Sequence, residues 1–177
     1  TDREKGFVVS VVDATNRSLD AIYWKDSFLM VRQREDEYFN TRTEMAAYKK
    51  FITDEFPQQF EDISKADQAD MLNRSINYFK QNDSFDLQTF TEEVIAAPEV
   101  IDSFKEYRQQ YQAENDVQMP DSYDINEAAV KKQERSYKSV IKLDRNFHIY
   151  VHGDRELIEQ GEDERGKFYK VYYNEES

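Results

Sequence analysis

The chain of 177 residues contains no cysteine. Without thiols it can form neither disulfides nor cysteine-ligated zinc sites, and a reducing cytoplasm suits it better than secretion. Glycine and proline are also scarce, at four and three residues. So few glycines leave little material for a loop that cradles phosphate, and neither the P-loop nor the dinucleotide-binding pattern occurs. No apolar run approaches the roughly 20 residues that a membrane-spanning helix requires.

These absences predict a cytoplasmic protein that is not an enzyme and that needs no metal or other cofactor. Serine-nucleophile motifs are missing as well. Carboxylates are abundant, but pairs such as Asp67 with Asp70 are expected on helix surfaces. Catalytic acids and bases require a concave, apolar setting instead. The acidic run 162–164 lacks the residue order of a calcium-binding loop.

Acidic residues outnumber basic ones, with 37 Asp and Glu against 24 Lys and Arg, and the formal net charge is -13. A charge of this sign repels nucleic acid from the molecule as a whole. Any contact with DNA must therefore come from a local basic patch. The alternative interpretation is that the acidity only keeps the protein soluble.

Hydrophobic periodicity predicts an α+β protein, with about five helices flanked by N-terminal strands and a small C-terminal antiparallel sheet. Strands are expected at 7–12, 21–31 and 147–151, followed by a hairpin that pairs 157–160 with 167–173. Helices are expected to begin near residues 41, 66, 87, 98 and 124. The chain then divides into a β segment (1–40), a helical subdomain (41–115) and a basic helix with the C-terminal sheet (116–177). We expect the three to form one compact domain.

Local signals set the expected helix ends. Thr41 and Glu44 have the spacing of a capping box, and Pro57 is expected to end the helix that they begin. Ser64 lies near the start of the second helix, which should run to residue 81. Pro98 suits a first helical position, because its missing amide costs nothing there. The helix that follows has the most regular apolar stripe, formed by Val100, Phe104, Tyr107 and Tyr111.

Basic residues are concentrated in the fifth expected helix (about 124–139) and just after it. Between residues 131 and 145 there are six basic and two acidic residues, a local charge of +4, so the other 162 residues sum to -17. If the helix continues that far, five of the six share one face, at spacings of 4, 3, 4 and 3. A basic stripe on an acidic body is typical of a surface that contacts phosphate, although it can also dock on acidic helices of its own chain. The candidate DNA- or partner-binding residues are Lys131, Lys132, Arg135, Lys138, Lys142 and Arg145.

Other chemistry-bearing residues favour structural roles. His148 and His152 lie four apart in an expected strand, about 13 Å from each other, which is too far for one metal ion. Trp24 is expected to be buried in a strand, the alternative being an exposed anchor for a partner. Along the sequence, aromatic and basic residues alternate too sparsely for a surface that stacks single-stranded bases. No helix-turn-helix spacing is present.

Several segments resemble a known family. They are DMLNRSINYFK (70–80), SFKEYRQQYQAEN (103–115) and, within 128–161, AVKKQERSYKSVIKLDRNFHIYVHGDRELIEQG; the closing GKFYKVYYNEE is similar too. The chain therefore resembles the C-terminal half of bacterial nucleoid-associated (NdpA-like) proteins. The resemblance implies a cytoplasmic protein located at the nucleoid, with DNA and nucleoid proteins such as topoisomerases as partners. It implies no catalytic residue.

Two hypotheses follow. In the first, the protein is a non-enzymatic, nucleoid-associated fragment whose basic face contacts the DNA backbone without reading sequence. In the second, it is a protein-interaction or dimerisation module without direct DNA binding, and the homodimer is the simplest assembly of that kind. An unrecognised hydrolase is a third alternative, which requires a cluster of carboxylates in a pocket.

Overall fold

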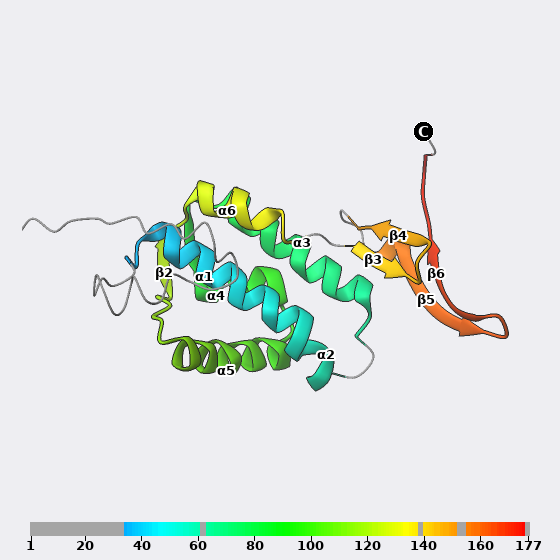
Figure 1. Cartoon of the computed structure of the whole chain (residues 1–177), viewed down its shortest axis with the longest axis horizontal. Coiled ribbons are helices and arrows are strands. Elements are labelled where there is room, and N and C mark those ends of the chain that lie inside the picture. Colours follow the sequence, from blue (N-terminus) through cyan, green and yellow to red (C-terminus); the bar gives the residue numbers. More distant parts are fainter. Residues whose placement is uncertain (1–33, 61–62, 138–139, 152–154, 176–177) are drawn as a thin grey trace, which may run out of the picture. The chain divides into compact units, whose positions relative to one another are not determined.

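The computed structural model describes residues 34–60, 63–137, 140–151 and 155–175. From Glu35 onward these residues belong to one compact unit. Helices form its first part, interrupted by two short strands, and two hairpins follow them (Figure 1). The expected α+β class is therefore confirmed. The strands expected at 7–12 and 21–31, and Trp24 with them, lie outside the described residues.

The helical segments include two π-helices, η3 and η4, and one 3-10 turn, η5. In chain order they are α1 (Glu37–Lys50), η3 (Phe51–Glu55), α2 (Phe56–Gln59), α3 (Lys65–Gln81), α4 (Leu87–Phe90), η4 (Thr91–Ile95), α5 (Pro98–Asn115), α6 (Glu127–Glu134) and η5 (Arg155–Leu157). None of these described helices is long and apolar enough to cross a membrane.

The start of α1 differs from the expectation. The Asp36 side chain accepts a hydrogen bond from the Phe39 amide at 3.0 Å, so it caps the helix five residues before Thr41. Thr41 and Glu44 are buried within the helix, and the capping box expected there is wrong. Pro57 does not end the helix either. The chain continues through η3 into α2, where Pro57 occupies the first turn and its missing amide is tolerated.

The starts of α3, α4 and α5 follow their local signals. Ser64 and Asp67 form a reciprocal capping box at α3, which runs to Gln81 as expected. Asp86 caps α4 through the Thr89 amide, and Pro98 is the first residue of α5. The last helix, α6, is capped by Asn126 rather than beginning at residue 124.

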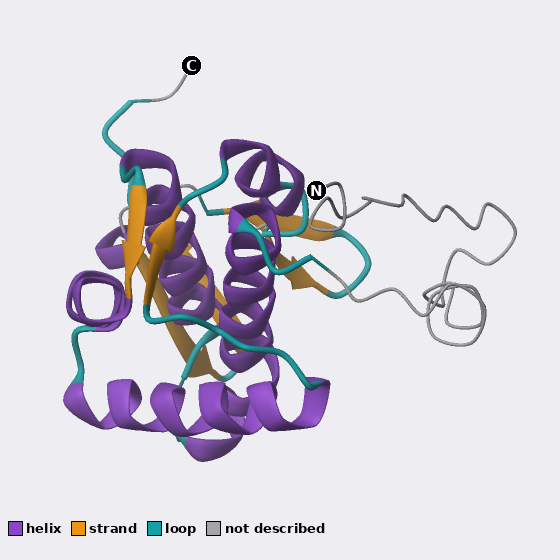
Figure 2. Ribbon diagram, turned by 90° about the vertical axis from the view of Figure 1, so that its left-hand side faces the viewer, coloured by secondary structure: helices purple, strands orange, loops and turns teal. Residues whose placement is uncertain are grey.

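The strands form three separate antiparallel pairs, β1 with β2, β3 with β4 and β5 with β6 (Figure 2). Their bounds are β1 (Ser84–Asp86), β2 (Ser122–Asp124), β3 (Val140–Leu143), β4 (Phe147–Tyr150), β5 (Ile158–Asp163) and β6 (Gly166–Val171). The expected strand at 147–151 and the final hairpin are confirmed. The turn of that hairpin is tighter than expected. Gly166 takes a φ of +118°, a backbone angle that residues other than glycine rarely adopt.

Two apolar clusters hold the unit together. The larger is aromatic and joins α1, η3, α3, η4 and α5; Tyr48 lies at its centre, edge-on to Phe90 and Phe104 with ring centroids 5.0 and 5.3 Å apart. The smaller joins Ala66 and Ala69 of α3 to Ile141, Val151 and Ile158 of the two C-terminal hairpins. Helix α3 therefore contributes to both clusters and links the hairpins to the helices.

Candidate nucleic-acid interface

Helix α6 carries the first part of the basic stretch. The Asn126 side chain accepts a hydrogen bond from the Ala129 amide at 3.1 Å, and this caps the helix. Ala129 and Val130 are buried, whereas Lys131 and Lys132 of the last turn are exposed. Cations at this end interact favourably with the negative end of the helix dipole. The sequence therefore buries one side of α6 and leaves its lysines in solvent.

The helix ends earlier than the expected 124–139. After Glu134 the chain turns, as the Ser136 amide and hydroxyl both donate to the Gln133 carbonyl, each at 2.8 Å. The buried Tyr137 then donates a hydrogen bond from its hydroxyl to the Met45 carbonyl of α1. This bond fixes the end of α6 against α1. Burial raises the pKa of Tyr137 well above its ordinary value, so the hydroxyl stays protonated and can donate.

The structure does not bring the basic residues together on one helical face. Lys131 and Lys132 belong to α6, and Arg135 lies in the turn after it. Lys142 lies on strand β3, and Arg145 lies in the turn between β3 and β4. The helical arrangement expected from the spacing is therefore wrong, because VIKL forms a strand whose buried residue, Ile141, packs on α3. Lys138 lies outside the described residues.

Helix α3 supports both parts of the basic region instead. At its C-terminal end, Lys80 donates to Glu134 of α6 at 2.5 Å. Nearer its N-terminal end, the Asn73 amide group donates to the Val151 carbonyl at 2.8 Å, and Arg155 pairs with Asp67 at 2.6 Å. The view in Figure 1 shows α6 beside α3 and the hairpins beyond the start of α3. The two elements that carry candidate cations, α6 and the β3–β4 hairpin, therefore both contact α3.

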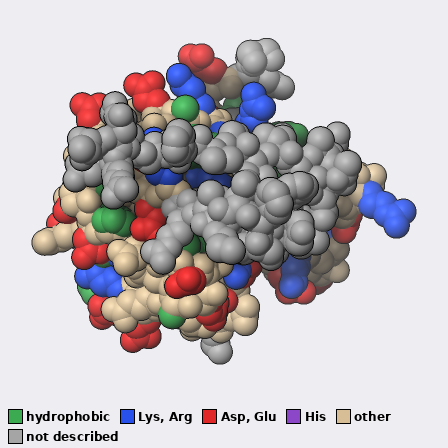
Figure 3. All heavy atoms as spheres, turned by 60° about the vertical axis from the view of Figure 1, so that its left-hand side comes forward, with side chains coloured by type: hydrophobic (Ala, Val, Ile, Leu, Met, Phe, Trp, Pro, Cys, Tyr) green, Lys and Arg blue, Asp and Glu red, His purple; other side chains and the backbone are tan. Residues whose placement is uncertain are grey.

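All five described candidates are exposed. Lys131 forms an ion pair with Glu127 at 3.7 Å, but both side chains are more than three-quarters exposed, so the pair is weak. For the other four, no ion pair occurs within the part of the chain that the structure describes. The chain as a whole has a net charge of -13, and Figure 3 shows one face on which Asp and Glu side chains are spread with Lys and Arg among them. What these cations can do is attract phosphate over a short range.

The remaining candidate groups have structural partners. The carboxylate of Asp67 caps α3 and pairs with Arg155, and these contacts together hold its pKa below the ordinary value although partial burial opposes them. Asp70 pairs with Arg74 four residues along α3, at 3.0 Å. His148 is exposed on β4, and His152 lies outside the described residues. Among the residues described, no three His, Cys, Asp or Glu side chains are grouped as metal ligands.

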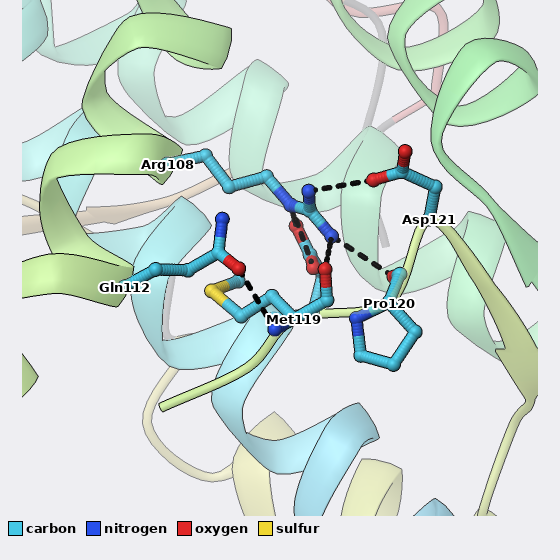
Figure 4. A network of polar contacts seen from close by, with 6 residues as sticks. Arg108, Gln112, Met119, Pro120 and Asp121 are labelled. Atoms are coloured by element: carbon cyan, nitrogen blue, oxygen red, sulfur yellow. Dashed lines mark hydrogen bonds and ion pairs between the residues drawn. The ribbon is translucent and has the colours of Figure 1, made fainter. Parts of the chain in front are cut away.

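A buried polar network around Arg108 has no counterpart in the sequence-based predictions (Figure 4). Its Nε donates to both carboxylate oxygens of Glu44 at 3.1 Å, and Nη1 donates to Asp121 at 2.8 Å. Nη2 donates to the carbonyls of Met119 and Pro120 at 2.7 and 2.9 Å. Burial raises the pKa of Glu44 to about 7, even though Arg108 opposes the shift.

This network fixes the segment that leads to α6. Arg108 holds residues 119–121 against α5, and the adjoining strand β2 then pairs with β1. The Asn126 amide donates to the Thr41 hydroxyl at 3.0 Å, so the capping residue of α6 is itself bound to α1. The sequence did contain a signal for Arg108. It follows Phe104 by four residues and precedes Tyr111 by three, so it interrupts the buried stripe of α5.

Comparison with known proteins agrees with the resemblance found in the sequence. All of the chain, residues 1–177, matches the family model described as nucleoid-associated protein YejK. No curated protein and no solved structure matches the chain.

Proposed function

Because the chain belongs to the family of nucleoid-associated protein YejK, we propose that its nucleoid-associated role rests on contact between its exposed cations and the DNA backbone. The contact surface consists of Lys131, Lys132 and Arg135 at the end of α6 and Lys142 and Arg145 of the β3–β4 hairpin; we call it the basic face. The protein is not an enzyme, needs no cofactor and works in the cytoplasm at the nucleoid. DNA is its first partner, and nucleoid proteins such as topoisomerases are further ones.

The observation that carries the proposal is the exposure of these five cations on elements that one helix holds in place. Ile141 packs beside Ala69 near the start of α3, and Glu134 contacts Lys80 near its end. The two points lie eleven residues apart on α3, roughly 16 Å along the helix axis. Duplex DNA carries one phosphate charge per roughly 1.7 Å of its axis, so a face of this length can meet several phosphates.

The net charge of -13 and the small number of exposed cations predict how binding depends on salt. With about three to five phosphates neutralised, the logarithm of the binding constant should fall with the logarithm of salt concentration at a slope of roughly -3 to -4.5. The described candidates are divided among α6, β3 and two turns instead of lying on one helix, so we expect affinity to depend little on base sequence.

A charge-reversal experiment tests the proposal. The variant Lys131→Glu, Arg135→Glu, Lys142→Glu removes three cations of the basic face. The control Arg42→Glu, Lys50→Glu, Lys105→Glu makes the same change in net charge at exposed positions on α1 and α5. We expect the first variant to lose binding to a fluorescent duplex at low salt. The fold-loss of affinity in the control should be less than a tenth of that in the first variant. Equal losses in both variants would mean that only the net charge matters and that the basic face is not the site.

A protein-interaction or dimerisation module is the second candidate function. One observation favours it, because six large apolar side chains of the C-terminal strands and the residues after them are exposed, and a protein partner could cover them. They are Phe147, Tyr150, Phe168, Val171, Tyr172 and Tyr173. Light scattering distinguishes the two functions. A dimer that is unaffected by DNA, together with no DNA binding at low salt, would favour the second.

A further inference from the structure

The β3–β4 hairpin has two faces of different character. Its register places Ile141 opposite Ile149 on one face, and Lys142 opposite His148 on the other. The first face is turned inward, as Ile141 and Ile149 pack with the alanines of α3. On the second face Lys142 and His148 are exposed, and the next pair joins Val140 to Tyr150, which is 60% exposed. Pairing across the strands thus places a cation and two aromatic rings side by side.

The charge of this face differs from that of the rest of the protein. None of the eight paired residues of β3 and β4 is acidic, whereas β5 and β6 contain Glu159, Glu162 and Asp163. In the turn between the strands, the negative charge of Asp144 and the positive charge of Arg145 cancel. On a chain with a net charge of -13, the hairpin is therefore a local surface that phosphate can approach.

A hollow of about 300 Å³ adjoins the same face. Buried Ala69 and Leu72 of α3 form part of its lining, and exposed Lys65 and Lys142 lie at its rim. The Lys65 ammonium group donates to Gln68 at 3.0 Å, which holds it at the start of α3. No carboxylate belongs to the lining, which consists of Thr53, Lys65, Gln68, Ala69, Leu72, Val140 and Lys142.

We infer that this face and the hollow, which we call the hairpin platform, bind unpaired DNA. The ring of Tyr150 stacks on a base, His148 offers a second ring, and Lys142 and Lys65 contact the phosphates on either side. Surfaces that bind single strands combine cations with exposed aromatic rings in this way. A duplex hides the faces of its bases, so stacking on Tyr150 discriminates in favour of a single strand.

The inference rests on the proposed function, since Lys142 belongs to the basic face, and it adds the form of DNA that is bound. The linear order of residues conceals the platform, because its members become neighbours only when the strands pair. Tyr150 and Val140 are ten positions apart in the chain, and only the antiparallel pairing makes them neighbours.

The test measures the affinity of the full chain for an oligothymidylate of about 20 nucleotides and for a duplex of equal length, by fluorescence anisotropy at low salt. Tyr150→Ala should weaken oligothymidylate binding by about 5- to 150-fold, the usual cost of losing one stacking ring. Duplex affinity should change by less than about twofold. Tyr150→Phe keeps the ring and should restore binding. Tyr173→Ala, which removes a ring that is 69% exposed outside the platform, is the matched control.

Each outcome has a separate meaning. If Tyr150→Ala leaves oligothymidylate binding unchanged, or weakens single-strand and duplex binding equally, the platform is wrong and the proposed function stands. If the unmodified chain binds neither oligonucleotide, the proposed function itself fails. If Tyr150→Ala instead abolishes a dimer seen by light scattering, the face is a protein interface. A second variant, Lys142→Met, should weaken binding to both oligonucleotides, because Lys142 belongs to the basic face as well as to the platform, and circular dichroism checks that both variants fold.

Discussion

Replacing Arg108 by methionine tests whether the buried network stabilises the fold. Methionine is similar in length and apolar, so the substitution removes the charge and the donors while keeping most of the volume. Its effect can be worked out contact by contact. The ion pair with Asp121 contributes little, since that carboxylate is 77% exposed. The Met119 carbonyl is buried, and leaving it without a donor costs about 1–3 kcal/mol.

The larger part comes from Glu44, whose side chain is 1% exposed and whose carboxylate accepts from Arg108. Removing one partner of a buried pair typically costs about 3–5 kcal/mol, because the other charge is left unpaired or must take up a proton. The contributions are not additive, so we expect Arg108→Met to lower the free energy of unfolding by about 3–5 kcal/mol in all. Such a loss is a large part of the total stability of a domain.

The assay is urea denaturation near pH 8, followed by far-ultraviolet circular dichroism. The control Arg42→Met removes an exposed arginine of α1 and should change stability by no more than about 0.5 kcal/mol. The double variant Glu44→Leu, Arg108→Met removes both buried charges and should regain at least half of the loss. A loss below about 1 kcal/mol in the single variant would refute the reasoning, because the buried carboxylate would then not depend on Arg108.

Two further predictions concern stability. Burial raises the pKa of Glu44 from its ordinary value of 4.5 to about 7, so the native state binds more protons than the unfolded state between these values. The stabilising contribution of Glu44 is complete below about 4.5 and is lost as pH rises through about 7. The loss amounts to ~3 kcal/mol. Between pH 5 and pH 8 the free energy of unfolding of Glu44→Gln, measured by denaturation, should therefore decrease less than that of the unmodified chain. Ser64→Ala removes the cap of α3 and should lower stability by about 0.5–2 kcal/mol. Ser84→Ala, at an exposed position of β1, serves as its control, and equal effects of the two serines would contradict the capping role.

Local signals were sufficient to predict the helices whose ends depend on neighbouring residues. Ser64 and Pro98 act within a single turn, so α3 and α5 begin where the sequence places them. The same reasoning failed at Thr41 and Glu44. Their spacing is that of a capping box, but both side chains are required in the core, one by the amide of Asn126 and the other by Arg108. A local sequence pattern cannot reveal that Glu44 contacts Arg108, which lies 64 residues further along the chain.

The basic region shows a second limit. Spacings of 4 and 3 between lysines and arginines fit a helix, yet all four residues from 140 to 143 pair with β4. Apolar Ile141 decides the outcome, because a strand buries it against α3 while leaving Lys142 exposed on the other face. The three-residue strands β1 and β2 are too short to show any period. The concentration of basic residues in this region was therefore visible in the sequence, whereas the elements on which they lie depended on tertiary pairing.

The buried network and the basic face are parts of one arrangement. Arg108 fixes the segment before β2, Asn126 joins the start of α6 to Thr41, and Tyr137 joins its end to Met45. Both ends of an eight-residue helix are thus bound to α1. A helix this short is not stable by itself, so these bonds determine where its lysines lie. If the basic face contacts DNA as proposed, the net negative charge of the chain limits that contact to a few phosphates. Because α6 is held in place at both ends, its cations then lose less conformational entropy on binding.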